Sequence, residues 1–227
     1  MNRQREHLTL LRLFQLASPS LPVGAYAYSQ GLEWAIDAGW VCDESTLTDW
    51  LDDQLAHSLG GVDLPILARL HSATCAEDER AQLHWSRQLV ALRETRELVD
   101  DDCDRGRALA RLLRDLGVDR AASWVSRRDA PFAALIALAA AAWDIPLSSL
   151  MHAYAWGWLE NQVLVGVRLI PLGQVAGQRL LLDLARGIPA VCDAALARSD
   201  DEIGGMLPSL ALASCLHETQ YTRLFRS

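Results

Sequence analysis

Apolar residues recur along most of the chain at the three- and four-residue spacing of an amphipathic helix. Between residues 45 and 59 they stand at Leu47, Trp50, Leu51, Leu55 and Leu59. Ser45 is a favourable N-cap and the pair Gly60-Gly61 a favourable stop, so this segment predicts one helix with one buried face. Because a helix tolerates proline in its first turn, Pro65 predicts that the next helix opens at Asp63.

The same spacing continues to the end of the chain. It predicts further helices over residues 8–17, 63–75, 80–100, 109–116, 133–143, 146–170, 174–186, 189–198 and 208–216. Residues 133–143 are almost entirely apolar, which places them in the middle of a bundle. Residues 163–170 are rich in β-branched side chains, yet no partner strand is evident, so we expect them to be helical. The predicted fold is all-α, one domain built as a bundle of about ten helices.

The amino-acid composition excludes several kinds of active site and partner. The 227 residues include 21 basic ones, all of them arginine, and 29 acidic ones, which gives a formal net charge of −8. Without lysine the sequence has no Walker A phosphate loop, no pyridoxal Schiff base and no lysine nucleophile. The acidic balance argues against nucleic-acid and anionic-membrane partners. The most apolar run, residues 131–143, is shorter than the roughly 20 residues that span a bilayer, so no membrane span is expected.

The cysteines and histidines do not indicate a disulfide framework or a metal site. The five cysteines are scattered without a C-x-x-C pair, which predicts reduced, buried thiols in the cytosol. The six histidines form no H-x-x-E-H or H-E-x-x-H motif, so a preformed metal site is not expected. We therefore expect no catalytic centre and no stably bound cofactor.

The least helix-like segment, residues 18–33, reads SPSLPVGAYAYSQGLE. It contains two prolines, a glycine at position 24 suited to positive φ, and tyrosines at positions 26 and 28 that we expect to be exposed. Irregular connections of this length are often functional, so it is a candidate partner-binding loop. An ordered structural loop is an alternative. Another is a small α-helical serine hydrolase, because Ser29 lies in a degenerate G-x-S-x-G nucleophile elbow that lacks its first glycine.

Two charged segments are further candidates. In RETREL, residues 93–98, Arg93 and Glu97 stand one helical turn apart and are expected to pair on a solvated helix face. The final residues, 219–227, mix aromatic, aliphatic and arginine side chains of the types enriched at interface hot spots. This end is therefore expected to dock on a partner or back onto its own domain, with His217 beside it.

Four segments together resemble the signature segments of a known family. They are SPSLPVGAYAYSQGLEWA, RETREL, VRLIPLGQ and HETQYTRLFRS, and they resemble those of the urease accessory protein F family, UreF, in the same order over nearly the whole chain. The motif positions of the family fall on Pro22, Gly24, Tyr28, Ser29, Gly31 and Glu33, on Arg93, Glu94, Arg96 and Glu97, and on His217, Glu218, Gln220, Arg223 and Arg226. Departures are slight, at Tyr26, Gln30 and Thr222. Gln30 excludes a histidine ligand common to the family at that position.

The resemblance implies a cytoplasmic, homodimeric, non-catalytic protein of urease maturation. Such a protein binds the accessory protein UreD, also called UreH, and recruits the GTPase UreG. The complex docks on apo-urease and helps load its nickel site in a GTP-dependent way, so nickel is handled by the complex. The absence of lysine agrees, because the phosphate loop then belongs to the partner.

The resemblance also suggests roles for individual residues. Arg223, Leu224, Phe225 and Arg226 are expected to anchor UreD, and Tyr28 with the RETREL face is expected to meet UreG. Ser29, Glu33, His217, Glu218 and Gln220 complete the candidate partner-binding set. Two alternatives remain: an arginine supplied in trans to the GTPase, and a nickel carrier that uses His217 and the scattered cysteines.

Overall fold

The computed structural model describes residues 2–227, with side chains from residue 4 onward. Across that range the chain forms eleven α-helices and no β-strand, which confirms the all-α prediction. The first six are α1 (Asn2–Ala17), α2 (Leu32–Asp37), α3 (Glu44–Asp53), α4 (Leu64–Cys75), α5 (Glu79–Ala91) and α6 (Arg96–Asp115). The others are α7 (Phe132–Ala142), α8 (Leu147–Leu169), α9 (Gln174–Ala185), α10 (Ile188–Ala197) and α11 (Pro208–His217).

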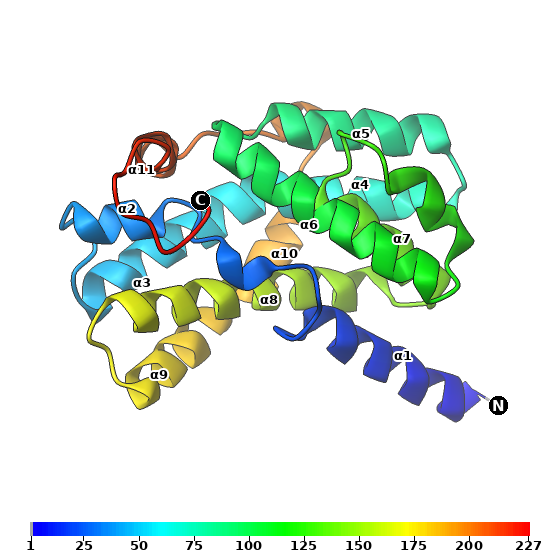
Figure 1. The fold of residues 1–227 in the computed structure, drawn as a ribbon. Coiled ribbons are helices and arrows are strands. Elements are labelled where there is room, and N and C mark those ends of the chain that lie inside the picture. Colours follow the sequence, from blue (N-terminus) through cyan, green and yellow to red (C-terminus); the bar gives the residue numbers. More distant parts are fainter. Residues whose placement is uncertain (1) are drawn as a thin grey trace.

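The core forms around α4, α7 and α8 (Figure 1). Helix α7 packs against α4 and α6 and is almost completely buried, as its apolar sequence predicts. Helix α8 carries α1 and α9 on its outer side, and α11 packs on α2 next to the start of α6. Helix α1 reaches out from the body at one end, while the C-terminal segment returns over α2 near the middle (Figure 1). These contacts bring together α2, the start of α6, and α11 with the C-terminal segment, which are far apart in the sequence.

The predicted helix stop at Gly60 and Gly61 is wrong. The chain continues from α3 through a π-helical stretch, η2 (Gln54–Asp63), directly into α4. A Cβ atom on Gly60 would lie 2.8 Å from Cγ1 of Val191, and one on Gly61 would lie 3.1 Å from the carbonyl oxygen of Gly204. Both glycines therefore allow neighbouring segments to approach closely. At the other end of α3 the cap is Asp43 rather than the predicted Ser45.

The prediction of one continuous helix over residues 80–100 is also wrong. Helix α5 ends at Ala91, and Thr95 caps a new helix, α6, by accepting a hydrogen bond of 3.3 Å from the N–H of Leu98. Helix α6 then includes the separately predicted segment 109–116. Because the break between α5 and α6 falls inside RETREL, Arg93 lies before α6 and Glu97 lies within it. The two residues are therefore not on successive turns of one helix. Their expected pairing does not form.

The remaining predictions about the fold have mixed outcomes. Residues 163–170, despite their β-branched side chains, lie mostly in α8. The expectation of buried cysteines holds only for Cys103 and Cys192, since the other three are exposed. Within the described range no helix is both long and apolar enough to cross a bilayer.

Candidate functional site

The C-terminal tail, residues 218–227, folds back onto the irregular segment before α2 (Figure 1). The N–H of Arg226 donates to the carbonyl oxygen of Ala27 at 2.8 Å. The backbone N–H groups of Ser29 and Gln30 donate to the carbonyl oxygen of Ser227 at 2.5 and 3.0 Å, and the Ser29 hydroxyl donates to the same oxygen. Phe225 is buried, so the tail is fixed by an apolar contact as well as by hydrogen bonds.

Positive φ angles shape the receiving segment. Gly24 has φ 78°, as its sequence context predicts, and Gly31 has φ 81°. A Cβ atom on Gly31 would lie 3.0 Å from the backbone nitrogen of Ser214 in α11, so glycine also permits the close approach of that helix. The short helix η1 (Ala25–Ala27) between these two turns presents the carbonyl that the tail uses.

A buried charge network connects the tail to α2, α6 and α11. The two ring nitrogens of His217 face two carboxylates: Nδ1 lies 2.7 Å from Oε2 of Glu97, and Nε2 lies 3.1 Å from Oε2 of Glu33. Glu97 also accepts from Arg223 at 2.8 Å. Glu33 accepts the backbone N–H groups of Leu224 and Phe225 at 2.7 and 3.0 Å. The side chain of His217 is fully buried, although most residues of the tail that follows it are exposed.

A second cluster lies deeper, around Arg93. Its guanidinium makes a bidentate contact with Asp63, at 3.0 and 2.6 Å, and two hydrogen bonds with Asp102, at 3.0 and 2.8 Å. The hydroxyl of Tyr154 donates to Asp63 at 3.0 Å. Burial alone would lower the pKa of Arg93, but the Asp102 and Asp63 carboxylates outweigh it and raise that pKa well above its ordinary value. Arg93 is therefore a permanent cation that compensates two buried carboxylates.

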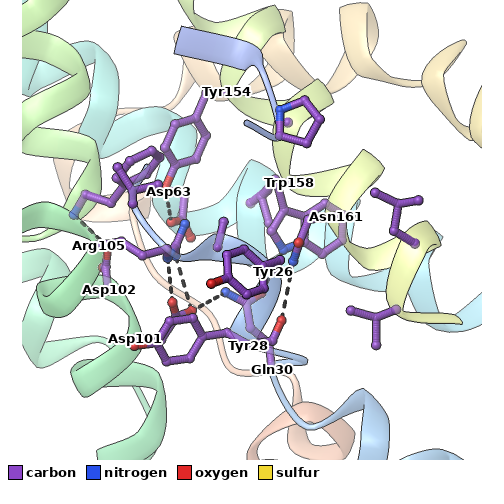
Figure 2. Close-up of a pocket in the computed structure, with 18 of the residues that line it drawn as sticks. Tyr26, Tyr28, Gln30, Asp63, Asp101, Asp102, Arg105, Tyr154, Trp158 and Asn161 are labelled. Carbon is purple, nitrogen blue, oxygen red and sulfur yellow. Dashed lines mark hydrogen bonds and ion pairs between the residues drawn. The ribbon is translucent and has the colours of Figure 1, made fainter. Parts of the chain in front are cut away.

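The Arg93 cluster borders a cavity of about 380 Å³ between the 18–28 segment, α6 and α8 (Figure 2). On its wall Gln30 donates to Asp101 at 2.8 Å and accepts from the Trp158 indole at 2.8 Å. Burial raises the pKa of Asp101, although Arg105 opposes the shift. Tyr28 donates to Asp104 at 3.4 Å and is buried, so the prediction of two exposed tyrosines holds only for Tyr26.

The serine-hydrolase alternative finds no support. Ser29 is fully buried and its hydroxyl is bonded to the carbonyl of Ser227. Both nitrogens of the nearby His217 face carboxylates, so that ring is not placed to act as a base for Ser29. No strand precedes Ser29 in the described chain, whereas a nucleophile elbow needs a strand-to-helix turn.

The nickel-carrier alternative also finds no support in this arrangement. From residue 4 onward no three His, Cys, Asp or Glu side chains are grouped so that they could hold a metal ion. Burial raises the pKa of Cys103 to about 12 and that of Cys192 to about 11, which disfavours the thiolate form that binds metals.

The candidate partner-binding residues fall into two sets. One set is buried or half-buried: Tyr28, Ser29, Glu33, Arg93, Glu97, His217, Gln220 and Phe225. The other set is exposed: Glu94, Arg96, Glu218, Arg223, Leu224 and Arg226. Sequence reasoning did not place Asp63, Asp102 and Tyr154 in a site, because nothing in their local pattern reveals that Asp63 pairs with Arg93 30 positions away and with Tyr154 91 positions away, or that Arg93 also binds Asp102.

Comparison with known proteins identifies the class. The family model described as UreF matches residues 41–185. A urease accessory protein UreF of Alkalilimnicola ehrlichii is 54% identical over 216 residues, covering 95% of both chains. A protein of the same name from Pseudomonas putida is 51% identical over 220 residues, covering 97% of this chain and 98% of the relative. One from Chromohalobacter salexigens is 46% identical over 225 residues, with 99% and 97% covered.

The chain belongs to the UreF family of urease accessory proteins. This confirms the family membership that the four sequence segments predicted.

Proposed function

We propose that this protein is a non-enzymatic scaffold that binds UreD (UreH), recruits the GTPase UreG and assists GTP-dependent nickel insertion into apo-urease. Its family membership supports a role in urease maturation. The observation that carries the proposal is the docked tail, which presents exposed apolar and cationic side chains on an ordered backbone. Tyr221 is fully exposed and Leu224 is 77% exposed. Large exposed apolar side chains gathered on one ordered segment are typical of a protein interface.

We define the tail surface as Tyr26, Arg96, Tyr221, Leu224 and Arg226. All five side chains are exposed, and each belongs to a segment that the docked tail contacts or forms. The family resemblance assigns Leu224 and Arg226 of this surface to UreD, and assigns the RETREL face, which includes Arg96, to UreG together with Tyr28. Because the tail touches Ala27 and Glu97, the two groups adjoin, and we propose that UreD and UreG bind at neighbouring positions there. Phe225 is buried and anchors the tail that carries this surface.

The buried residues of the family motifs have a supporting role in this proposal. Ser29, Glu33 and His217 hold the tail, and Arg93 holds α4 against the start of α6. A second copy of the chain completes the proposed assembly as a homodimer. An arginine supplied in trans to the GTPase would have to be an exposed one, and of the two arginines in RETREL that is Arg96, whose side chain is 85% exposed.

Co-expression with UreD and UreG followed by size-exclusion chromatography tests the proposal. Leu224→Arg places a cation on the tail surface, and Leu182→Arg on α9 is the matched control because Leu182 is 62% exposed. We expect Leu224→Arg to lose at least one partner from the complex while Leu182→Arg retains both. Equal retention of both partners by the two variants would contradict the tail surface.

A further inference from the structure

His217 has a pattern of contacts that a neutral imidazole cannot complete. A neutral ring has one N–H donor and one lone pair, while an ionised carboxylate only accepts. Both ring nitrogens of His217 nevertheless face carboxylate oxygens, at 2.7 Å for Glu97 and 3.1 Å for Glu33. Both contacts are hydrogen bonds only if the three groups together hold one further proton, on the ring or on one carboxyl.

The charge balance of the network requires the same proton. Glu33 from α2 and Glu97 from α6 contribute two negative charges, and Arg223 from the tail contributes one positive charge. The additional proton brings the total charge of these side chains and His217 to zero. The carboxylate side chains are only 7% and 13% exposed, so an uncompensated charge here would be costly. These three are the charged side chains in contact with His217 or its carboxylates, within the described chain.

The two carboxylates that share this proton also hold the tail. Oε2 of Glu33 accepts from both His217 and the N–H of Phe225, while Oε1 accepts from Leu224. Glu97 accepts from His217 through one oxygen and from Arg223 through the other. Removal of the proton would place a lone pair of the ring against a carboxylate. One of the two anchors of the tail would then be repelled.

We propose that His217 is a positioning residue: one additional proton shared with Glu33 and Glu97 fixes both carboxylates in the orientation that docks the tail. Docking therefore takes up one proton relative to a released tail that lacks it. By linkage, raising the pH favours release. The consequence for partner recruitment rests on the proposed function, but docking itself is a property of the isolated chain.

Hydrogen exchange of the Leu224 and Phe225 amides tests this inference in the isolated full chain. Protection at these two positions, corrected for the intrinsic pH dependence of exchange, should fall as the pH is raised. The slope should approach about tenfold per pH unit, as expected for one linked proton. Nitrogen-15 spectra of the His217 side chain should show the additional proton on the ring or in a hydrogen bond to it.

Glu97→Gln provides the matched control. Its side-chain NH₂ can donate to the lone pair of a neutral His217, and its carbonyl can still accept from Arg223. This variant should keep the tail docked and lose the pH dependence. His217→Ala should lose protection at the two amides at every pH while α7 amides stay protected.

Two results would overturn the inference: wild-type protection that does not change with pH, or the same slope in Glu97→Gln. Neither depends on UreD or UreG. A tail that docks in the expected pH-dependent way but recruits no partner would contradict the proposed function alone.

Discussion

Replacement of Arg93 by methionine should remove a large part of the stability of this fold. The guanidinium is 14% exposed and makes four hydrogen bonds to Asp63 and Asp102, whose side chains are 5% and 2% exposed. Methionine is a shorter side chain that keeps an unbranched apolar stem, and it leaves both buried carboxylates without the cation that bonds to them. Breaking a buried pair in this way costs about 3–5 kcal/mol. That is a substantial share of the roughly 5–15 kcal/mol that stabilises a typical domain.

Urea unfolding followed by far-UV circular dichroism measures the change. The transition midpoint of Arg93→Met should fall while the slope stays near the wild-type value, because the surface exposed on unfolding is nearly the same. Arg96→Met is the control from the same motif. Its side chain is 85% exposed and lies 3.8 Å from Asp100, so its loss should stay within about 0.5 kcal/mol.

A compensating variant separates the loss of the ion pair from loss of packing. In the Arg93→Met background, Asp63→Asn and Asp102→Asn remove the two uncompensated charges and should recover part of the stability. A loss for Arg93→Met no larger than that for Arg96→Met would refute the assignment of Arg93 to a structural role. So would a failure of the two asparagines to recover any stability.

Three further outcomes follow from the buried groups. Gly106→Ala should prevent accumulation of folded protein in soluble extracts, because its Cβ would lie 1.8 Å from the carbonyl oxygen of Ala130. Thiol titration of the native protein at pH 8 should detect three accessible cysteines, and Cys103 and Cys192 should react only after unfolding, since burial raises the pKa of each thiol. Burial, with the nearby Asp63, raises the pKa of Tyr154 well above its ordinary value of about 10. Stability from this phenol is therefore present below that value and lost as the pH rises above it, so urea unfolding at pH 9 and pH 11 should show a larger loss in wild type than in Tyr154→Phe.

Most of the fold could be predicted from the sequence because most of it depends on local periodicity. The apolar run of α7 and the spacing in α3 and α9 each predict a helix without reference to any other segment. The errors fall where tertiary contacts override a local signal. The pair Gly60-Gly61 is typical of a helix stop, yet the helical conformation continues through it. Both glycines are instead positions where a neighbouring segment packs too closely to leave room for a side chain. Thr95 is a different case: threonine is itself a favourable N-cap, but the helix-forming residues on both sides of it obscure that local signal.

The candidate site could be predicted only in outline. Resemblance indicated which segments matter, and the sequence pattern indicated that the tail docks on something. Which residues meet is a matter of long-range pairing: Glu33 lies 184 positions before His217, and Glu97 lies 126 positions before Arg223. No local pattern contains that information. The helical spacing instead suggested an Arg93–Glu97 pair, whereas each residue binds a distant partner of its own.

The nickel content of urease matured in cells tests directly whether this protein assists metallocentre assembly. Urease would be purified from cells that co-express UreD, UreG and either this chain, no UreF, or the Leu224→Arg variant, and its nickel and activity would be measured. We expect nickel-loaded, active urease with the wild-type chain, and largely nickel-free enzyme with the variant or without UreF. Equal nickel content with and without the chain would contradict a role in metallocentre assembly.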